Sequence, residues 1–181
     1  MIGALIGDIA GSRFEWHNNK SKSFELLVKG WCRPTDDSVM TLAVASAVLE
    51  SGPDFEWLSE LTVKHMQAFG RRYPKAGYGR RFHDWIYSED PRPYHSWGNG
   101  SAMRVSACGY AASSLEEATW LARKVTAVTH NHPDGVRGAE AVAAAIYMAL
   151  HGSSKPEISD YISMHYYEVD FMLEDIRAEY S

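Results

Sequence analysis

Two adjacent carboxylates, Asp36 and Asp37, follow Thr35 in the segment PTDDS. A threonine hydroxyl and two neighbouring carboxylates are the kind of oxygen ligands that Mg²⁺ and Mn²⁺ prefer. Adjacent carboxylates repel one another, so their close placement becomes favourable when a divalent cation lies between them. The same residues also suit a helix start, because threonine is a good N-cap and acids in the first turn interact favourably with the helix dipole. Both interpretations stay open at this point.

A further acid, Glu15, ends the segment GDIAGSRFE and lies just past an expected N-terminal helix that carries Asp8. Exposed acids at such positions need no special explanation. An acid in a loop after a glycine-striped helix could, however, be carried close to a site on a neighbouring helix. Gly3, Gly7 and Gly11 form that stripe, and tight helix packing is the favoured explanation for the first two.

The segment SWGNGSAMR suggests a site for phosphate. Gly98, Asn99 and Gly100 permit positive φ, and Ser101 is then placed to cap a helix of small residues. Free backbone N–H groups at such a helix start bind phosphate or pyrophosphate readily. A plain loop-to-helix junction explains the same pattern, so the segment alone does not decide.

Two histidines, His130 and His132, lie in the segment THNHPDGVRG. A spacing of two does not place them on one helical face, and no cysteine is near, so zinc ranks low. The remaining choices are a hydrogen-bonded loop and a loop that contacts a ligand. A fifth segment, residues 70–85, interleaves basic and aromatic residues and could bind a nucleic-acid backbone. The net charge of −5 argues against a general nucleic-acid binder, so nucleic acid is not the expected partner.

Helices must position these groups, because alanine-rich segments with apolar residues three and four apart recur and clear period-2 strands are absent. The expected fold is all-α, a single-domain compact helical bundle over residues 1–181. Residues 70–98 form an expected irregular tract. Helices are expected in the N-terminal segment, after Thr35, over 54–69, 100–113, 115–128 and 136–151, and in two stretches of 155–181, the second from near Tyr167.

The composition describes an ordinary globular protein of 181 residues, with 45% hydrophobic and 23% charged residues. Cys32 and Cys108 lie far apart without a CxxC pattern, which suits a reducing compartment. The N-terminus lacks a basic stretch before its short apolar run, and no run approaches the ~18 residues of a membrane span. A cytoplasmic protein without membrane partners is therefore expected.

The order of the segments is more specific than any one of them. GALIGDIAGSRFE, PTDDSVMTLAVA, GRRYPKAGYGRRF, GNGSAMRV and THNHPDGVRGAEAVAAAIYMAL follow one another as in the ADP-ribosylglycohydrolase family, dinitrogenase reductase-activating glycohydrolase-like, which this chain resembles over essentially its whole length. The resemblance implies an all-α fold with a pair of Mg²⁺ or Mn²⁺ ions at the bottom of a cleft. It also implies hydrolysis of the N- or O-glycosidic bond of an ADP-ribosylated protein or an ADP-ribose-containing small molecule.

Carried over residue by residue, the resemblance implies roles for three sets of side chains. Asp36 and Glu15 are the candidates for positioning or activating water. The metal ligands are Thr35, Asp36 and Asp37, and the substrate-binding residues are Asn99, Gly100, Ser101, Met103, His130 and His132.

The chain departs from the family pattern in one respect. It contains no second acidic motif of the G-D-[ST]-D-[ST] kind, and after Leu150 its aspartates are the isolated Asp160, Asp170 and Asp175. The expectation is the N-terminal two-thirds of the family's usual length: a natural truncation, a split gene or a fragment. A C-terminal complementing chain or a homo-oligomer would then cover exposed apolar surface. A non-catalytic ADP-ribose-binding or helical interaction module is the alternative function.

Overall fold

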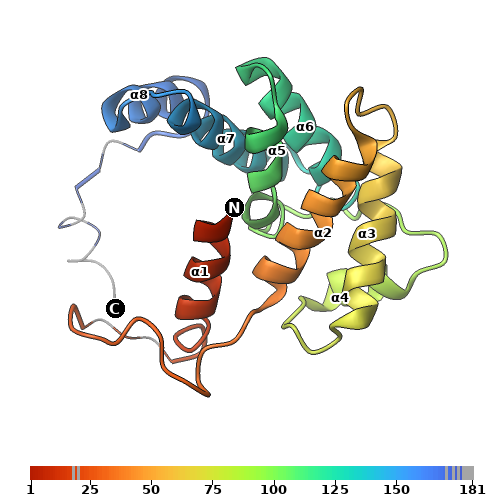
Figure 1. Ribbon diagram of the computed structural model, residues 1–181, viewed down its shortest axis with the longest axis horizontal. Coiled ribbons are helices and arrows are strands. Elements are labelled where there is room, and N and C mark those ends of the chain that lie inside the picture. The colour runs from red at the N-terminus through yellow and green to blue at the C-terminus, as the bar shows by residue number, and fades with distance from the viewer. Residues whose placement is uncertain (18, 20, 170, 173, 175, 177–181) are drawn as a thin grey trace.

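The computed structural model describes residues 1–17, 19, 21–169, 171, 172, 174 and 176. These residues form helices and no strand, which confirms the all-α expectation (Figure 1). The elements are α1 (Ile2–Gly11), α2 (Asp36–Ser51), α3 (Leu58–Arg72), α4 (Arg80–Tyr87), the 3-10 turn η1 (Ala102–Arg104), α5 (Ser106–Ala111), α6 (Leu115–Ala127), α7 (Pro133–Leu150) and α8 (Lys155–His165).

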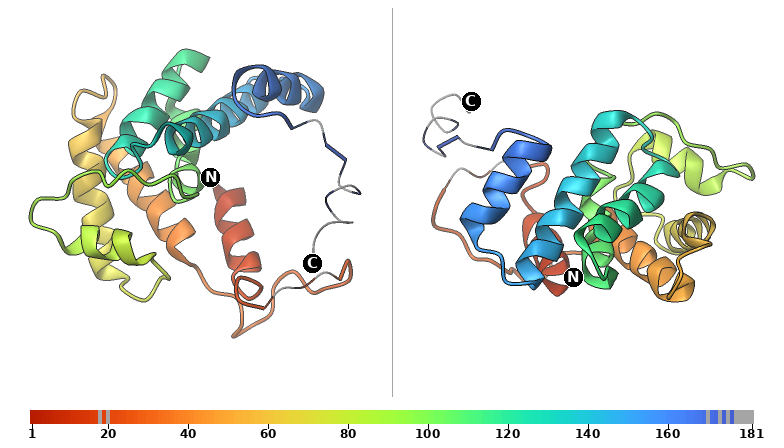
Figure 2. Two further views of the ribbon diagram at one scale, coloured as in Figure 1. Left: turned by 180° about the vertical axis from the view of Figure 1, so that it is seen from behind. Right: turned by 90° about the horizontal axis from the view of Figure 1, so that it is seen from above.

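Helix α2 is the central element for the site. It packs against α3 on one side and α5 on another, and α1 approaches its N-terminal end (Figure 1). Helices α5, α6 and α7 pack together, and α8 lies beside α7 in both views of Figure 2. The core contains many alanines, such as Ala43, Ala47, Ala122, Ala139 and Ala143, so the helix axes approach closely.

The start of α2 confirms the helix-cap interpretation of the acidic segment. Thr35 is the N-cap residue, and its hydroxyl accepts a 3.4 Å hydrogen bond from the Asp37 N–H. Asp36 and Asp37 occupy the first turn, as expected for acids near a positive helix end. The cap uses only the N–H of Asp37, and Asp36 and Asp37 are half-buried at the helix start.

The expectation that residues 70–98 are irregular was wrong for residues 70–72 and 80–87, which are helical. Helix α3 continues to Arg72, and α4 follows after a short loop. Helix α4 buries Phe82, Trp85 and Ile86, which are spaced three and four apart and so share one face. A Cβ on Gly70 of α3 would lie 2.6 Å from Ile86 Cδ1, so glycine permits the close α3–α4 contact. The polar, glycine-rich flanks obscured this short pattern.

The helix expected over 100–113 is divided into η1 and α5. Ser101 precedes η1 without capping it, because its hydroxyl donates to the carbonyl oxygen of Gly135 at 2.8 Å, and the Gly98 carbonyl oxygen lies farther away at 3.3 Å. Helix α7 begins at Pro133, earlier than the expected 136, since proline is compatible with the first helical position. The expected helix from near Tyr167 lies mostly outside the described residues.

Helix α1 does not pack through its glycines. No atom lies within 4 Å of a Cβ built on Gly3, Gly7 or Gly11, so the tight-packing interpretation was wrong. All of α1 is described, and Ala10 is its only buried residue, while Ile2 and Ile6 are 75% and 48% exposed. Something other than apolar burial must hold this helix against α2.

No helix in the described ranges combines the length and apolar character required to cross a bilayer.

Candidate functional site

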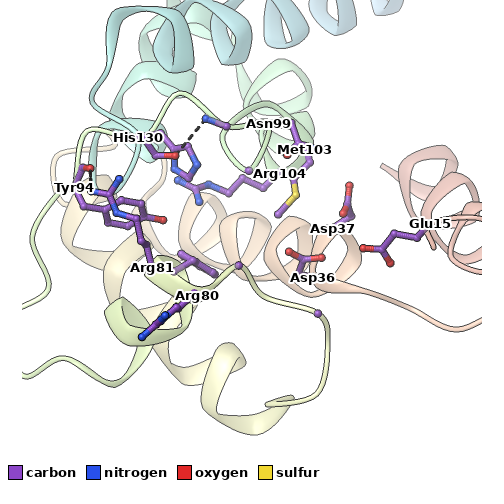
Figure 3. Close-up of a pocket in the computed structure, with 16 residues that line it drawn as sticks. Glu15, Asp36, Asp37, Arg80, Arg81, Tyr94, Asn99, Met103, Arg104 and His130 are labelled. Atoms are coloured by element: carbon purple, nitrogen blue, oxygen red, sulfur yellow. Dashed lines mark hydrogen bonds between the residues drawn. The ribbon is translucent and has the colours of Figure 1, made fainter. Parts of the chain in front are cut away.

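A cleft of about 470 Å³ opens between the N-terminal end of α2, the loop before α4 and the loop before η1 (Figure 3). Its two ends differ in chemistry. Three acids, Glu15, Asp36 and Asp37, lie together at one end, whereas arginines, Tyr94 and His130 lie at the other. The lining residues are Glu15, Asp36, Asp37, Gly77, Gly79, Arg80, Arg81, Phe82, Tyr94, Ser96, Gly98, Asn99, Gly100, Met103, Arg104 and His130.

The carboxylates at the acidic end of the cleft repel one another. Burial, together with the neighbouring charges of Asp37, Glu15 and Asp8, raises the pKa of Asp36 from 3.8 to about 6. Burial and Asp8 also raise the pKa of Asp37. Each charged carboxylate therefore disfavours ionisation of the next. A cation placed between them would relieve this repulsion, since it favours the charged forms.

The loop before α4 closes over Asp36. The Asp36 N–H donates to the Ala76 carbonyl oxygen at 2.9 Å. Gly77 has a φ of +106°, and its Cβ would lie 3.8 Å from Asp36 Oδ1. A residue with a side chain would be strained in this left-handed conformation, so glycine allows the loop to meet the acid.

Asp8, which sequence reasoning left unassigned, fastens α1 to the site. Its carboxylate accepts the Thr35 N–H at 2.8 Å, the Thr35 hydroxyl at 2.5 Å, the Ser38 N–H at 3.2 Å and the Ser38 hydroxyl. A carboxylate thus receives two N–H groups from the start of α2, a favourable place for a negative charge. Because Glu15 lies shortly after α1, this anchor also fixes the end of α1 from which Glu15 reaches the cleft.

The acids fit one side of a hard-cation site. Asp36 and Asp37 present carboxylate oxygens to the cleft, as Mg²⁺ or Mn²⁺ requires. Thr35 is buried and its hydroxyl donates to Asp8, so its metal-binding role stays a prediction. Within the described part of the chain, no group of three or more His, Cys, Asp or Glu residues is arranged to hold a metal ion.

The glycine-containing loop contributes the middle of the cleft. Gly100, Asn99 and Met103 line it, and their substrate-binding roles stay predictions. Ser101 does not, because it is buried and joins this loop to the first turn of α7 through its bond to Gly135. The structure therefore brings together three of these four residues in the cleft.

The two histidines of the segment THNHPDGVRG have different positions relative to the cleft. His130 lines the cleft, with its ring 5.8 Å from that of Tyr94. His132 is instead the N-cap residue of α7, where its Nδ1 accepts the Asp134 N–H at 3.1 Å. Its ring also packs against His95 and Trp97. His132 is not among the lining residues, and its substrate-binding role stays a prediction.

Sequence reasoning assigned His130 at the basic end of the cleft but did not place Arg81, Tyr94 or Arg104 there. Arg81 donates to the Tyr94 carbonyl oxygen at 2.5 Å, and its guanidinium lies 4.9 Å from the centre of the Tyr94 ring. Arg104 is buried, and burial lowers its pKa to about 10. An arginine inside the otherwise small and apolar segment SAMRV was the available signal, because arginine is rarely buried without a partner.

Gly100→Ala is expected to weaken ligand binding in this cleft. The new Cβ would lie 3.1 Å from His130 Nε2 and 3.2 Å from Cε1, so the ring must shift. Gly98→Ala is the matched control, because its Cβ meets Ser96 Oγ at 3.5 Å and His130 Nε2 at 3.9 Å. Overpacking of this kind costs about 1–2 kcal/mol, or roughly tenfold in affinity. Calorimetry with ADP-ribose, the ligand that the family resemblance implies, measures both variants, and equal affinities would contradict the expectation.

The chain is similar in sequence to known proteins. Residues 1–180 match the ADP-ribosylglycohydrolase family. The ADP-ribosylhydrolase ARH3 of Xenopus tropicalis is 29% identical over 94% of this chain and 55% of its own length. The ARH3 of Homo sapiens is 27% identical over 87% of this chain and 50% of its own length. The ADP-ribosylarginine hydrolase Tri1 of Pseudomonas putida (strain GB-1) is 26% identical over 87% of this chain and 47% of its own length.

The chain thus spans about half the length of these relatives, less than the two-thirds expected from the resemblance. The family match extends over all of the segments that build the cleft, from the loop after α1 to the loop before α7. On this match, the chain belongs to the ADP-ribosylglycohydrolase family.

Proposed function

We propose that the cleft binds ADP-ribose and, with Mg²⁺ or Mn²⁺ at its acidic end, hydrolyses the glycosidic bond that joins ADP-ribose to a protein or a small molecule. Family membership supports the ADP-ribosyl substrate class. Relatives are named as ADP-ribosylhydrolases and as an ADP-ribosylarginine hydrolase, which supports a hydrolase of ADP-ribosylated groups. Since the chain spans about half of these relatives, its own substrate and turnover are part of the proposal.

The observation that carries this proposal is the division of one cleft into an acidic end and a basic end. Asp36, Asp37 and Glu15 face the cleft at one end, and Arg81 and His130 lie at the other (Figure 3). ADP-ribose has a matching division, because its reacting sugar lies at one end and its diphosphate and nucleoside extend away from it. The cleft volume of about 470 Å³ is within the range for small-molecule sites.

The residues at each end have distinct tasks in this scheme. Asp36 and Asp37 would hold the cation, which supplies polarisation of sugar hydroxyls and water. Glu15 would accept a proton from the attacking water, and the acidic end as a whole would stabilise positive charge that develops on the ribose ring. Gly100 and its neighbours would offer backbone N–H groups to the diphosphate, because side chains there would block its approach.

Calorimetry of the protein with ADP-ribose, in the presence and absence of Mg²⁺, tests the proposal together with an assay of ADP-ribose release. Binding that requires Mg²⁺, with release from an ADP-ribosylated arginine or serine peptide, is the expected result. Mg²⁺-independent binding without release would favour the non-catalytic ADP-ribose-binding module. Failure to bind ADP-ribose under any condition would contradict both and leave the helical interaction module. AMP is the matched ligand control, since it lacks the reacting ribose.

A further inference from the structure

A buried chain of hydrogen bonds connects Arg104 to His130 behind the cleft wall. An Arg104 Nη2 donates to Thr129 Oγ1 at 2.7 Å and to the Val125 carbonyl oxygen at 3.1 Å. Thr129 Oγ1 in turn lies 2.7 Å from His130 Nδ1. The three side chains are almost fully buried, with exposures of 1% for Arg104, 0% for Thr129 and 5% for His130. Figure 3 shows Arg104 reaching beneath the glycine-containing loop toward His130.

The position of one hydrogen atom follows from this arrangement. Arginine can only donate, so Arg104 occupies a lone pair of the Thr129 oxygen. The Thr129 hydroxyl has a single hydrogen, and its two acceptors are His130 Nδ1 at 2.7 Å and the Thr126 carbonyl oxygen at 3.5 Å. The shorter contact is the stronger hydrogen bond, so the hydrogen is directed to Nδ1. Nδ1 is then the unprotonated nitrogen, and a neutral His130 ring carries its hydrogen on Nε2.

The charge state of the ring agrees with this assignment. Burial and the neighbouring Arg104 cation lower the pKa of His130 to about 3. The ring is therefore neutral at pH 7. A protonated ring would also need to donate from Nδ1 to an oxygen that already accepts from Arg104, leaving the Thr129 hydroxyl only the distant Thr126 carbonyl.

The Nε2 side of the ring faces the glycine-containing loop. A Cβ built on Gly100 would lie 3.1 Å from Nε2, and one on Gly98 would lie 3.9 Å away. Among the described residues, none forms a hydrogen bond with Nε2, whereas Nδ1 has Thr129. One end of the imidazole is thus fixed by the protein, and the other is available at the wall of the cleft.

We propose that Arg104 and Thr129 are positioning residues that fix His130 as its neutral Nε2–H tautomer, so that it donates one hydrogen bond to an acceptor oxygen of the ligand. Thr129 does not line the cleft, and Arg104, although it borders the cleft, is only 1% exposed, so each residue acts through the histidine ring. The identity of the ligand as ADP-ribose rests on the proposed function, whereas the tautomer does not.

Nuclear magnetic resonance of the full chain with ¹⁵N-labelled histidine tests the tautomer directly. His130→Gln assigns the resonances of His130 among the eight histidines. The wild-type spectrum at pH 7 is expected to show a protonated Nε2 and an unprotonated Nδ1. A protonated Nδ1 in the wild-type protein would overturn the proposal without any variant that must fold.

Variants of two buried threonines then separate positioning from packing. Thr129→Val removes the hydroxyl and is expected to add the Nδ1–H form to the spectrum, while Thr129→Ser restores the wild-type pattern. Thr126→Val is the matched control, because the Thr126 hydroxyl is buried without a hydrogen-bond partner in the described structure. A Thr129→Val spectrum identical to that of the wild type would overturn the positioning role.

Calorimetry with ADP-ribose extends the test to binding. Thr129→Val is expected to weaken affinity about fivefold, and Thr129→Ser and Thr126→Val to leave it within about twofold. Wild-type affinity in Thr129→Val, despite an altered tautomer, would overturn the role in binding. If the wild-type protein does not bind ADP-ribose at all, the proposed function fails, and the spectra still decide the assignment of the tautomer.

Discussion

Replacement of both Asp36 and Asp37 by asparagine is expected to slow Mg²⁺-dependent release of ADP-ribose by about a hundredfold or more. The same double variant is expected to be more stable than the wild type when no metal is bound. The loss follows because neutral amides hold a divalent cation poorly. The gain follows because the two carboxylates repel each other and are partly buried, as the raised pKa of Asp36, about 6, indicates. Relief of such repulsion gives about 1 kcal/mol, or roughly 2–4 °C in Tm.

The pH dependence of this stabilisation has a defined sign. A carboxyl with a raised pKa in the folded state stabilises the fold most below its unfolded pKa, and that contribution is lost as the pH rises through the folded value. The double variant is therefore expected to have a higher free energy of unfolding than the wild type above about pH 6. This difference should shrink as the pH falls from about 6 toward 3.8. Thermal unfolding without metal measures it across this range.

Asp84→Asn on α4 is the control for these measurements, because its side chain is 75% exposed. It should leave release and Tm nearly unchanged. Undiminished release from the double variant would refute the assigned cation site. A lower Tm of the metal-free double variant would instead show that the acids stabilise the helix start more than they repel each other.

Asp8→Ala is expected to produce the largest loss of stability among the site residues. It leaves the Thr35 N–H and the Ser38 N–H without their carboxylate acceptor and frees α1 from α2. Hydrogen bonds to a charged group contribute about 1.5–3 kcal/mol each, and the set is not additive, so a loss of roughly 3 kcal/mol is expected. For a chain of this length that lowers Tm by about 6–12 °C.

Two further variants, Asp8→Asn and Asp160→Ala, serve as controls for the loss of stability in Asp8→Ala. The asparagine keeps one acceptor oxygen and should lose about half as much stability as the alanine variant. Asp160 is an exposed aspartate on α8, and its removal should change stability by less than about 0.5 kcal/mol. Equal unfolding midpoints for Asp8→Ala and Asp160→Ala in urea would show that Asp8 does not anchor α1.

The helices that could be predicted from the sequence are those whose own residues form a recognisable local pattern. The α2 start was readable because Thr35 and the acids after it satisfy a local rule, and the structure retains that cap. Helix α4 was missed because three apolar residues, Phe82, Trp85 and Ile86, identify its buried face only once α3 is known to lie beside them. The glycines of α1 were misjudged because spacing on a helix does not reveal whether another helix is present.

The site residues likewise include some that local sequence patterns indicate and some that they do not. Asp36, Gly100 and His130 were assigned because their segments follow one another in a recognisable order, and all three line the cleft, while their roles stay predictions. Asp8 and Arg104 were not assigned, since their roles depend on contacts with Thr35 and Thr129, which lie 27 and 25 positions away. Pairings over such distances in the chain depend on the folded arrangement and leave no local pattern.

The anchoring of α1 has a consequence for the motions of the protein. A helix with one buried residue gains little from the hydrophobic effect, so its attachment depends mainly on the carboxylate of Asp8. Segments with few buried apolar contacts open locally at free energies well below that of global unfolding. When α1 opens, the loop after it is released as well, and Glu15 is displaced from the acidic end of the cleft. We therefore expect a local opening of α1 to limit how long Glu15 stays beside Asp36 and Asp37, and amide exchange in α1 would reveal this opening before any loss of the helical core.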